Sequence, residues 1–279
     1  MENFIEILKS ILFGIVEGVT EWLPVSSTGH MILLDEFVKL QVSDAFYSMF
    51  EVVIQLGAIL AVILLFFHKL NPIAPRKTAE EKKQTWQLWF KVVVAVLPSA
   101  VIGLLLDDWM DEHLYNYVVV AITLIVYGVA FLFVEKWNEK RTVKWESVYD
   151  IDYKTAIFIG CFQCLSLIPG TSRSGATILG AILLGVSRPA GAEFSFFLAI
   201  PTMLGASALK LLKFLLSGTP AGGLEFGVLA VGCIVSFIVS LLVIKALMEY
   251  VRKHSFSVFG IYRIILGVLV LGYFLITAM

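Results

Sequence analysis

The sequence predicts an all-α integral membrane protein with six transmembrane helices and two opposed re-entrant helix–loop–helix hairpins in an inverted-topology repeat. The first observation is composition: of 279 residues, 59% are hydrophobic and only 15% are charged, whereas about a quarter of the residues in soluble domains are charged. The second is that six apolar segments are long enough to cross a bilayer, while two further apolar regions are interrupted by polar loops. The third is the uneven distribution of lysine and arginine among the loops.

Each predicted transmembrane helix contains roughly 20 predominantly apolar residues, the length needed to cross a hydrocarbon core of about 30 Å. The six segments are residues 48–67, 86–106, 115–134, 190–212, 224–250 and 256–277. Regions 4–40 and 153–186 are also apolar, but each breaks at a loop that contains glycine, proline and serine. Irregular backbone at membrane depth is tolerated only where protein or a water-filled cavity surrounds it. Both regions are therefore predicted to be hairpins that enter and leave on one face.

The loop charges predict the orientation of these elements. Lysine and arginine are concentrated in loops 68–85, 135–152 and 251–255, whereas loop 107–114 has none and loop 213–223 has only Lys213. The positive-inside rule places the three basic loops in the cytoplasm and the other two outside. The first hairpin then enters from outside and the second from the cytoplasm.

Opposed entry predicts one membrane domain over residues 1–279, built from repeats 1–135 and 150–279. An offset of 146 residues supports the repeat, because it aligns Ser26 with Ser172, Thr28 with Ser174, and Gly29 with Gly175. Two unrelated kinked helices are the alternative, since a chain rich in glycine, serine and isoleucine gives some matches by chance. In inverted repeats with broken helices, the binding site lies near the midplane where the breaks meet.

The first hairpin contains two carboxylates, Glu17 and Glu21, four residues apart. An ionisable group at bilayer depth costs about 2.5–3.5 kcal/mol on insertion scales, so both are candidate functional residues. On a helix they share one face and repel each other. A divalent cation between them would offset that repulsion, and Mg²⁺ is usually held by one or two carboxylates together with phosphate oxygens. The alternative is that one glutamate pairs with Arg173 or a lysine.

Three hydroxyls and an imidazole follow, in Ser26, Ser27, Thr28 and His30. They precede a short apolar half-helix, whose N-terminus offers backbone N–H groups to an anion. A simple N-cap is the alternative for one of the hydroxyls. The spacing allows a hydroxyl–imidazole pair suited to nucleophilic catalysis, although a single histidine on an apolar face is more often a core residue.

The second hairpin contains Ser172, Arg173 and Ser174 between Gly170 and Gly175. A guanidinium group can bind two phosphate oxygens in a fork, and the flanking glycines let backbone approach a bulky anion. A salt bridge from Arg173 to a glutamate of the first hairpin is the alternative.

The stretches Glu17–His30 and Pro169–Thr177 resemble the two signature motifs of the bacterial undecaprenyl-diphosphate phosphatases, the integral-membrane type associated with bacitracin resistance. Segments 51–57, 193–201 and 261–263 resemble further blocks of that family, so the resemblance covers nearly the whole chain. No acidic, hydroxyl, histidine or arginine position of the two motifs departs from the family pattern.

The resemblance implies a hydrolase of the bacterial inner (plasma) membrane, with its active site facing the periplasmic or extracellular side. It would convert undecaprenyl diphosphate to undecaprenyl phosphate plus phosphate, which recycles the lipid carrier for peptidoglycan and other envelope polymers. A divalent cation, Mg²⁺ or Ca²⁺, is the implied cofactor. By motif match, Glu17 and Glu21 would bind metal or activate the attacking group, Ser27 would be the nucleophile, His30 a general acid/base, and Arg173 the phosphate clamp. Ser26, Thr28, Ser172 and Ser174 would complete the phosphate site.

Several alternatives stay open at this point. The attacking group is Ser27, His30 or water, and a lipid-phosphate flippase could use the same inverted-repeat architecture. The net charge of −1 gives no bias toward nucleic acid as a partner. The expected partners are a polyprenyl diphosphate and membrane lipid, and the oligomeric state is undetermined, a homodimer included.

Overall fold

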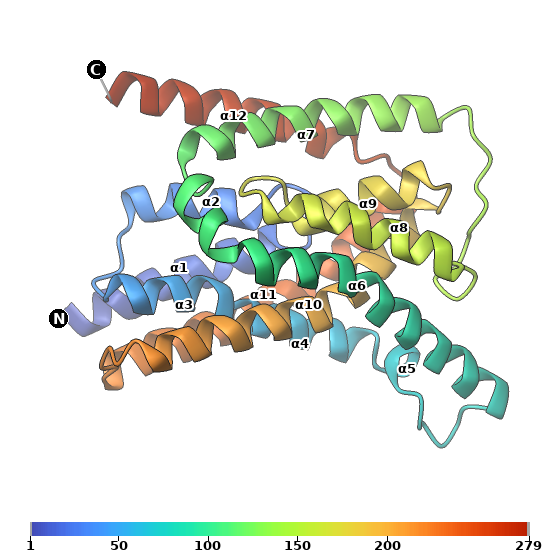
Figure 1. Ribbon diagram of the computed structural model, residues 1–279, viewed down its shortest axis with the longest axis horizontal. Helices are drawn as coiled ribbons and strands as arrows, with labels where there is room; N and C mark the ends of the chain where they lie inside the picture. Colours follow the sequence, from blue (N-terminus) through green and yellow to red (C-terminus); the bar gives the residue numbers. More distant parts are fainter. Residues whose placement is uncertain (1, 278–279) are drawn as a thin grey trace.

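The structure, a computed structural model, describes residues 2–277 as a bundle of helices (Figure 1). Met1, Ala278 and Met279, which the predicted domain includes, lie outside the described residues, as do the side chains of five others: Glu2, Asp107, Asp108, Asp111 and Thr277. The helices are α1 Glu2–Thr20, α2 Ser27–Phe37, α3 Asp44–Val53, α4 Gln55–Leu65, α5 Phe67–Leu70, α6 Ala79–His113, α7 Tyr117–Asn138, α8 Tyr153–Cys164, η1 Leu165–Leu167, α9 Arg173–Leu183, α10 Arg188–Leu216, α11 Gly223–Val251 and α12 Ser257–Thr277. The described residues contain no β-strand.

Six segments are long and apolar enough to span a membrane: Asp44–Leu65, Ala79–Leu106, Tyr117–Asn138, Arg188–Leu216, Gly223–Val251 and Ser257–Ile276. They overlap the six predicted spans, which confirms the prediction of an all-α, multi-pass membrane protein. One boundary differs. The predicted loop 107–114 is helical as far as His113, because no glycine or proline interrupts it, and the chain turns only before Asn116, which caps α7.

The first span is divided at Ile54 into α3 and α4, whereas the sequence predicts one continuous helix. Side chains from two neighbouring helices bind carbonyl groups in the last turn of α3. Ser207 Oγ donates to the carbonyl of Val52 at 3.2 Å, and Cys233 Sγ approaches that of Val53 at 3.6 Å. These contacts take up carbonyls that an uninterrupted helix would use internally.

The two interrupted regions each form a pair of antiparallel helices. Figure 1 shows α1 and α2 turning back on themselves from the left of the view, and α8 and α9 turning back from the right. The loop between α6 and α7 and the loop between α10 and α11 lie at the left, whereas the loops after α5 and α7 lie at the right. The hairpins thus start from opposite ends of the bundle, and their re-entrant placement in a membrane stays a prediction.

Helix boundaries correspond at the predicted offset of 146 residues. Helix α2 starts at Ser27 and ends at Phe37, and α9 starts at Arg173 and ends at Leu183. Helix packing corresponds as well, because α1 packs against α11 while α8 packs against α6. The division into repeats 1–135 and 150–279 itself stays a prediction.

Glycines set the closest helix contacts. A Cβ added at Gly160 of α8 would lie 2.0 Å from the carbonyl oxygen of Ala95 in α6. At Gly14, the position equivalent by the 146-residue offset, a Cβ would lie 2.7 Å from the carbonyl oxygen of Gly232 in α11. Backbones can approach this closely only where the side chain is a single hydrogen, as in many membrane helix pairs.

We expect Gly160→Ala to destabilise the protein by about 3 kcal/mol or more, because the methyl group meets backbone and must push two helices apart. Gly205→Ala is the matched control, since a Cβ there meets nothing within 4 Å and alanine favours a helix by about 0.5–1 kcal/mol. Unfolding midpoints in detergent measure both effects. Equal midpoints for the two variants would contradict the packing of α8 on α6.

Candidate functional site

The two polar loops meet in the interior, and each ends in the same local structure. Ser26 and Ser172 are the N-caps of α2 and α9, and their hydroxyls accept from the N–H groups of Gly29 at 3.2 Å and Gly175 at 3.1 Å. Among the described residues, they are the only non-glycine residues with positive φ, 75° and 74°. A side chain in that region is strained, and such strain is often found at functional sites.

Arg173 of the second loop binds Glu21 of the first. Its Nη2 and Nε lie 3.0 and 3.3 Å from Oε1 of Glu21, and its Nη1 donates to the carbonyl of Ser195 at 2.8 Å. The side chains of Arg173 and Glu21 are only 9% and 5% exposed. The structure therefore shows the salt bridge that the sequence left as the alternative, and this pair joins the two hairpins.

The hydroxyl of Ser27 donates to the other carboxylate oxygen of Glu21 at 2.6 Å. Ser27 is the first residue of α2, so its side chain stands at the N-terminus of that helix. Serine, carboxylate and arginine thus form a continuous chain of hydrogen bonds. A carboxylate that accepts from a serine hydroxyl is placed to take its proton.

His30 lies one turn into α2 and does not bind Ser27. Its Nδ1 lies 2.7 Å from the carbonyl oxygen of Ser26, and its Nε2 lies 2.7 Å from the hydroxyl of Tyr262. Because a carbonyl only accepts, Nδ1 carries the proton. The hydroxyl–imidazole pair that the spacing allows is thus replaced by a Ser27–Glu21 pair, and both ring nitrogens of His30 have other partners.

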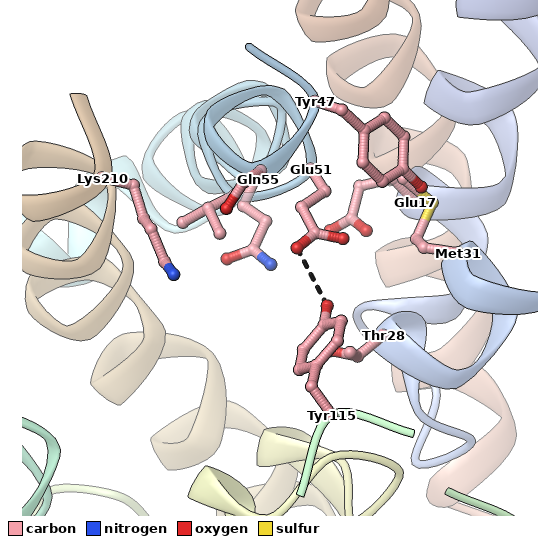
Figure 2. Close-up of a pocket in the computed structure, with 10 residues that line it drawn as sticks. Glu17, Thr28, Met31, Tyr47, Glu51, Gln55, Tyr115 and Lys210 are labelled. Carbon is pink, nitrogen blue, oxygen red and sulfur yellow. Dashed lines mark hydrogen bonds between the residues drawn. The ribbon is translucent and has the colours of Figure 1, made fainter. Parts of the chain in front are cut away.

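Glu17 is fully buried on α1, and neither of its carboxylate oxygens has a hydrogen-bond partner among the described residues. It lines a cavity of about 430 Å³. Figure 2 shows Glu17 and Glu51 pointing into this cavity from α1 and α3, with Lys210 extending toward it from α10. Tyr115 donates to Glu51 at 2.9 Å across the cavity.

A smaller cavity of about 150 Å³ lies next to the first, and Thr28 and Gln55 line both. Its wall includes three of the predicted phosphate-binding residues, Thr28, Ser172 and Arg173, together with the predicted catalytic residues Glu21 and Ser27. Ser174 lies behind this wall, fully buried, and donates to the carbonyls of Glu21 and Leu23 at 3.0 and 3.2 Å. The Ser26 hydroxyl is occupied by its helix cap, as is that of Ser172. Ser26 and Ser174 are not part of the cavity wall, whereas Ser172 lines it while it caps α9.

Sequence reasoning assigned no role to several residues of the site. Glu51, Gln55, Tyr115 and Lys210 line the larger cavity, and Ser195 supports Arg173. The signal was present for Glu51, because an ionisable group inside an apolar span is a functional candidate by default. Tyr115 gave no such signal, since tyrosine is common at the ends of membrane helices.

Arg263 of α12 is the clearest omission. It is fully buried, and it donates to the carbonyl of Pro24 at 3.1 Å and to that of Gly170 at 2.8 Å. One guanidinium group therefore ties the backbone of the first loop to that of the second. An arginine in the middle of an apolar span is again a detectable signal.

The acidic residues of the site fit a divalent cation whose remaining ligands are phosphate oxygens of a bound substrate and water. In the part of the chain that the structure describes, no group of three or more histidine, cysteine, aspartate or glutamate side chains forms a metal-binding cluster. Glu17, whose carboxylate is unpartnered, lies one turn before Glu21, and the N–H of Glu21 donates to the Glu17 carbonyl at 3.0 Å. One or two carboxylates suffice for Mg²⁺ when phosphate oxygens and water supply the remaining ligands.

Comparisons with known proteins identify the family of this chain. The model of the family described as "Bacitracin resistance protein BacA" matches residues 10–269. The chain is 60% identical to an undecaprenyl-diphosphatase of Lactiplantibacillus plantarum over 97% of its own length and 98% of the relative's. It is 58% identical to one from Enterococcus faecalis, and 58% identical to undecaprenyl-diphosphatase 1 of Clostridioides difficile, each over 98% of this chain and 99% of the relative. The chain therefore belongs to the BacA family of bacitracin resistance proteins.

Proposed function

We propose that this protein hydrolyses undecaprenyl diphosphate to undecaprenyl phosphate and inorganic phosphate at the junction of the two polar loops. The observation that carries the proposal is the buried chain Ser27–Glu21–Arg173, which places a nucleophile, a base and a phosphate-binding cation side by side. Family membership and the names of the relatives support the same activity. The enzyme would recycle the lipid carrier for peptidoglycan and other envelope polymers.

The substrate's amphipathic character explains the buried position of the site. A diphosphate headgroup fits cavities lined by Arg173, Lys210 and the N-terminus of α2, while the isoprenyl tail stays in the hydrocarbon between helices. The loop charges place the open end of the first hairpin outside, so we assign the site to the outer face of the plasma membrane.

Binding of the diphosphate changes the partner of Arg173. In the empty site the guanidinium group is bound to Oε1 of Glu21. A phosphate group that takes over the guanidinium fork frees that oxygen, while the other carboxylate oxygen still accepts from Ser27. Substrate binding therefore leaves one oxygen of Glu21 for a cation and the other for the Ser27 proton.

The reaction proceeds in two displacements. The Ser27 oxygen attacks the terminal phosphorus while its proton moves to Glu21, the bridging phosphorus–oxygen bond breaks, and undecaprenyl phosphate leaves. Water then attacks the phosphorus, the new serine–phosphorus bond breaks, the proton on Glu21 returns to the Ser27 oxygen, and phosphate is released. We assign acceptance of the water proton in this second step to Nε2 of His30, which contacts the Tyr262 hydroxyl, because Nδ1 is held by a carbonyl. The charge that develops on the phosphoryl group is stabilised by Arg173 and the N–H groups of α2.

Glu17 and Glu21 are the residues that would hold Mg²⁺ or Ca²⁺. The unpartnered carboxylate of Glu17 fits this role, since an uncompensated buried charge is costly. When bound, the cation supplies charge neutralisation for the diphosphate. Glu51 lines the same cavity and adds negative charge beside Glu17.

Purified protein with a polyprenyl diphosphate should release inorganic phosphate when Mg²⁺ or Ca²⁺ is present. We expect a chelator to lower the rate by about 100-fold or more, and added metal to restore it. A protein that binds the lipid but releases no phosphate would instead be the lipid-phosphate flippase. Full turnover in the presence of chelator would refute the proposed metal role and leave the proposed hydrolase activity standing.

A further inference from the structure

A second large cavity, of about 390 Å³, lies outside the proposed active site. Its wall combines cationic and apolar side chains from three parts of the chain. Lys69 comes from α5 and Glu193 from α10, while Ile244, Lys245 and Arg252 come from α11 and its C-cap. No residue of the two signature motifs lines it.

The two cavities lie at opposite ends of the bundle. Lys210 of α10 lines the first and Glu193 of the same helix lines the second. These residues are separated by about 25 Å along the helix at a rise of ~1.5 Å per residue. Figure 1 shows the same direction, since α3, which contributes to the first cavity, lies to the left of α5, which contributes to the second. The second cavity therefore opens at the end that carries the basic loops, which the loop charges predict to be cytoplasmic.

The second cavity carries excess positive charge. Lys69 lies 2.6 Å from the buried carboxylate of Glu193, and this pair is neutral overall. Lys245 and Arg252 lie seven residues apart on one face of α11, and neither forms a salt bridge with any residue that the structure describes. Two cationic groups thus face a cavity whose floor, including Phe66 and Ile244, is apolar.

Each cavity is lined by a glutamate and a lysine that come from different halves of the chain, and the half that supplies the glutamate differs between the two cavities. Glu51 from α3 and Lys210 from α10 line the first cavity, whereas Glu193 from α10 and Lys69 from α5 line the second. Among the described residues, none that lines the second cavity is a serine, threonine or tyrosine. It therefore has the charges to hold a phosphate group but no hydroxyl nucleophile to attack one.

We propose that this cavity binds the phosphate headgroup of an anionic membrane lipid from the face opposite the active site. The ammonium and guanidinium groups of Lys245 and Arg252 bind the phosphate, and the apolar floor receives the first carbons of the lipid tails. Lysine and arginine near an anionic membrane surface each add to such binding. A soluble anion gains nothing from the apolar floor, which is why the geometry favours a lipid.

Native mass spectrometry of the purified full-length protein, titrated with phosphatidylglycerol, tests this proposal. We expect Lys245→Gln with Arg252→Gln to weaken binding at least tenfold, because both cations are removed. Glu193→Gln should act in the opposite direction and tighten binding, since it frees Lys69 and removes the only carboxylate from the wall. Phosphate release should be unchanged in the double variant, so this test is independent of the proposed hydrolase activity.

Lys136→Gln with Lys140→Gln is the matched control, because it removes the same charge from exposed positions that do not line the cavity. An equal loss of binding in the control would show general surface attraction and would overturn the site. Equal affinity for zwitterionic phosphatidylcholine would overturn it as well. Displacement of the lipid by inorganic phosphate at the lipid's own concentration would show an anion site without a lipid and would refute the proposal.

Discussion

Glu21→Gln lowers phosphate release by about 1,000-fold or more, with the protein still folded in the membrane. The carboxylate of Glu21 binds both Ser27 and Arg173, so the amide removes the base and leaves a buried guanidinium group without its counter-charge. Loss of a general base alone costs about 10²–10⁴-fold. Steady-state release of phosphate from a polyprenyl diphosphate measures the effect.

A second ion pair with a buried carboxylate provides the control. Glu135 on α7 is 2% exposed and accepts from Arg188 Nε at 3.0 Å, away from both polar loops. Glu135→Gln removes the same charge from the same type of ion pair, so it reproduces any general cost to stability. We expect its turnover per folded molecule to stay within about threefold of the parent. Equal losses in Glu135→Gln and Glu21→Gln would mean that Glu21 is only structural.

Ser27→Ala produces the second large effect, a loss of about 1,000-fold or more in phosphate release. In the proposed reaction the Ser27 oxygen forms the bond to phosphorus, and no other hydroxyl donates to the Glu21 carboxylate among the described hydrogen bonds. Removal of a nucleophile leaves only the contribution of the binding groups. Acid quench with a terminally ³²P-labelled substrate should trap label on the parent protein and none on Ser27→Ala.

The Ser26→Ala variant distinguishes the loss of a nucleophile from the loss of a helix cap. The Ser26 hydroxyl caps α2 through the N–H of Gly29, so its loss costs stability, about 1 kcal/mol. Its turnover per folded molecule should fall far less than that of Ser27→Ala. Equal and mild losses in both variants would instead assign the attack to water or to His30.

The two motifs could be predicted from sequence because charge in an apolar segment is costly and therefore conspicuous. Glu17, Glu21 and Arg173 were all singled out for that reason, and the structure brings Arg173 and Glu21 together at 3.0 Å. The hydrogen-bond partners within the site could not be predicted in the same way. Sequence spacing suggested His30 for Ser27, but the rotation of α2 directs the His30 ring to Tyr262, which is more than 200 residues away in the chain.

The sequence by itself determined the class of fold, the six spans and the two interrupted hairpins, because hydropathy and glycine or proline breaks act over one helix length. Only the tertiary structure decided which side chains from distant helices complete the site. Glu51, Lys210 and Arg263 reach it from α3, α10 and α12. Such contacts depend on how helices pack and rotate against one another, as where Gly160 of α8 meets Ala95 of α6, and no local pattern encodes that rotation.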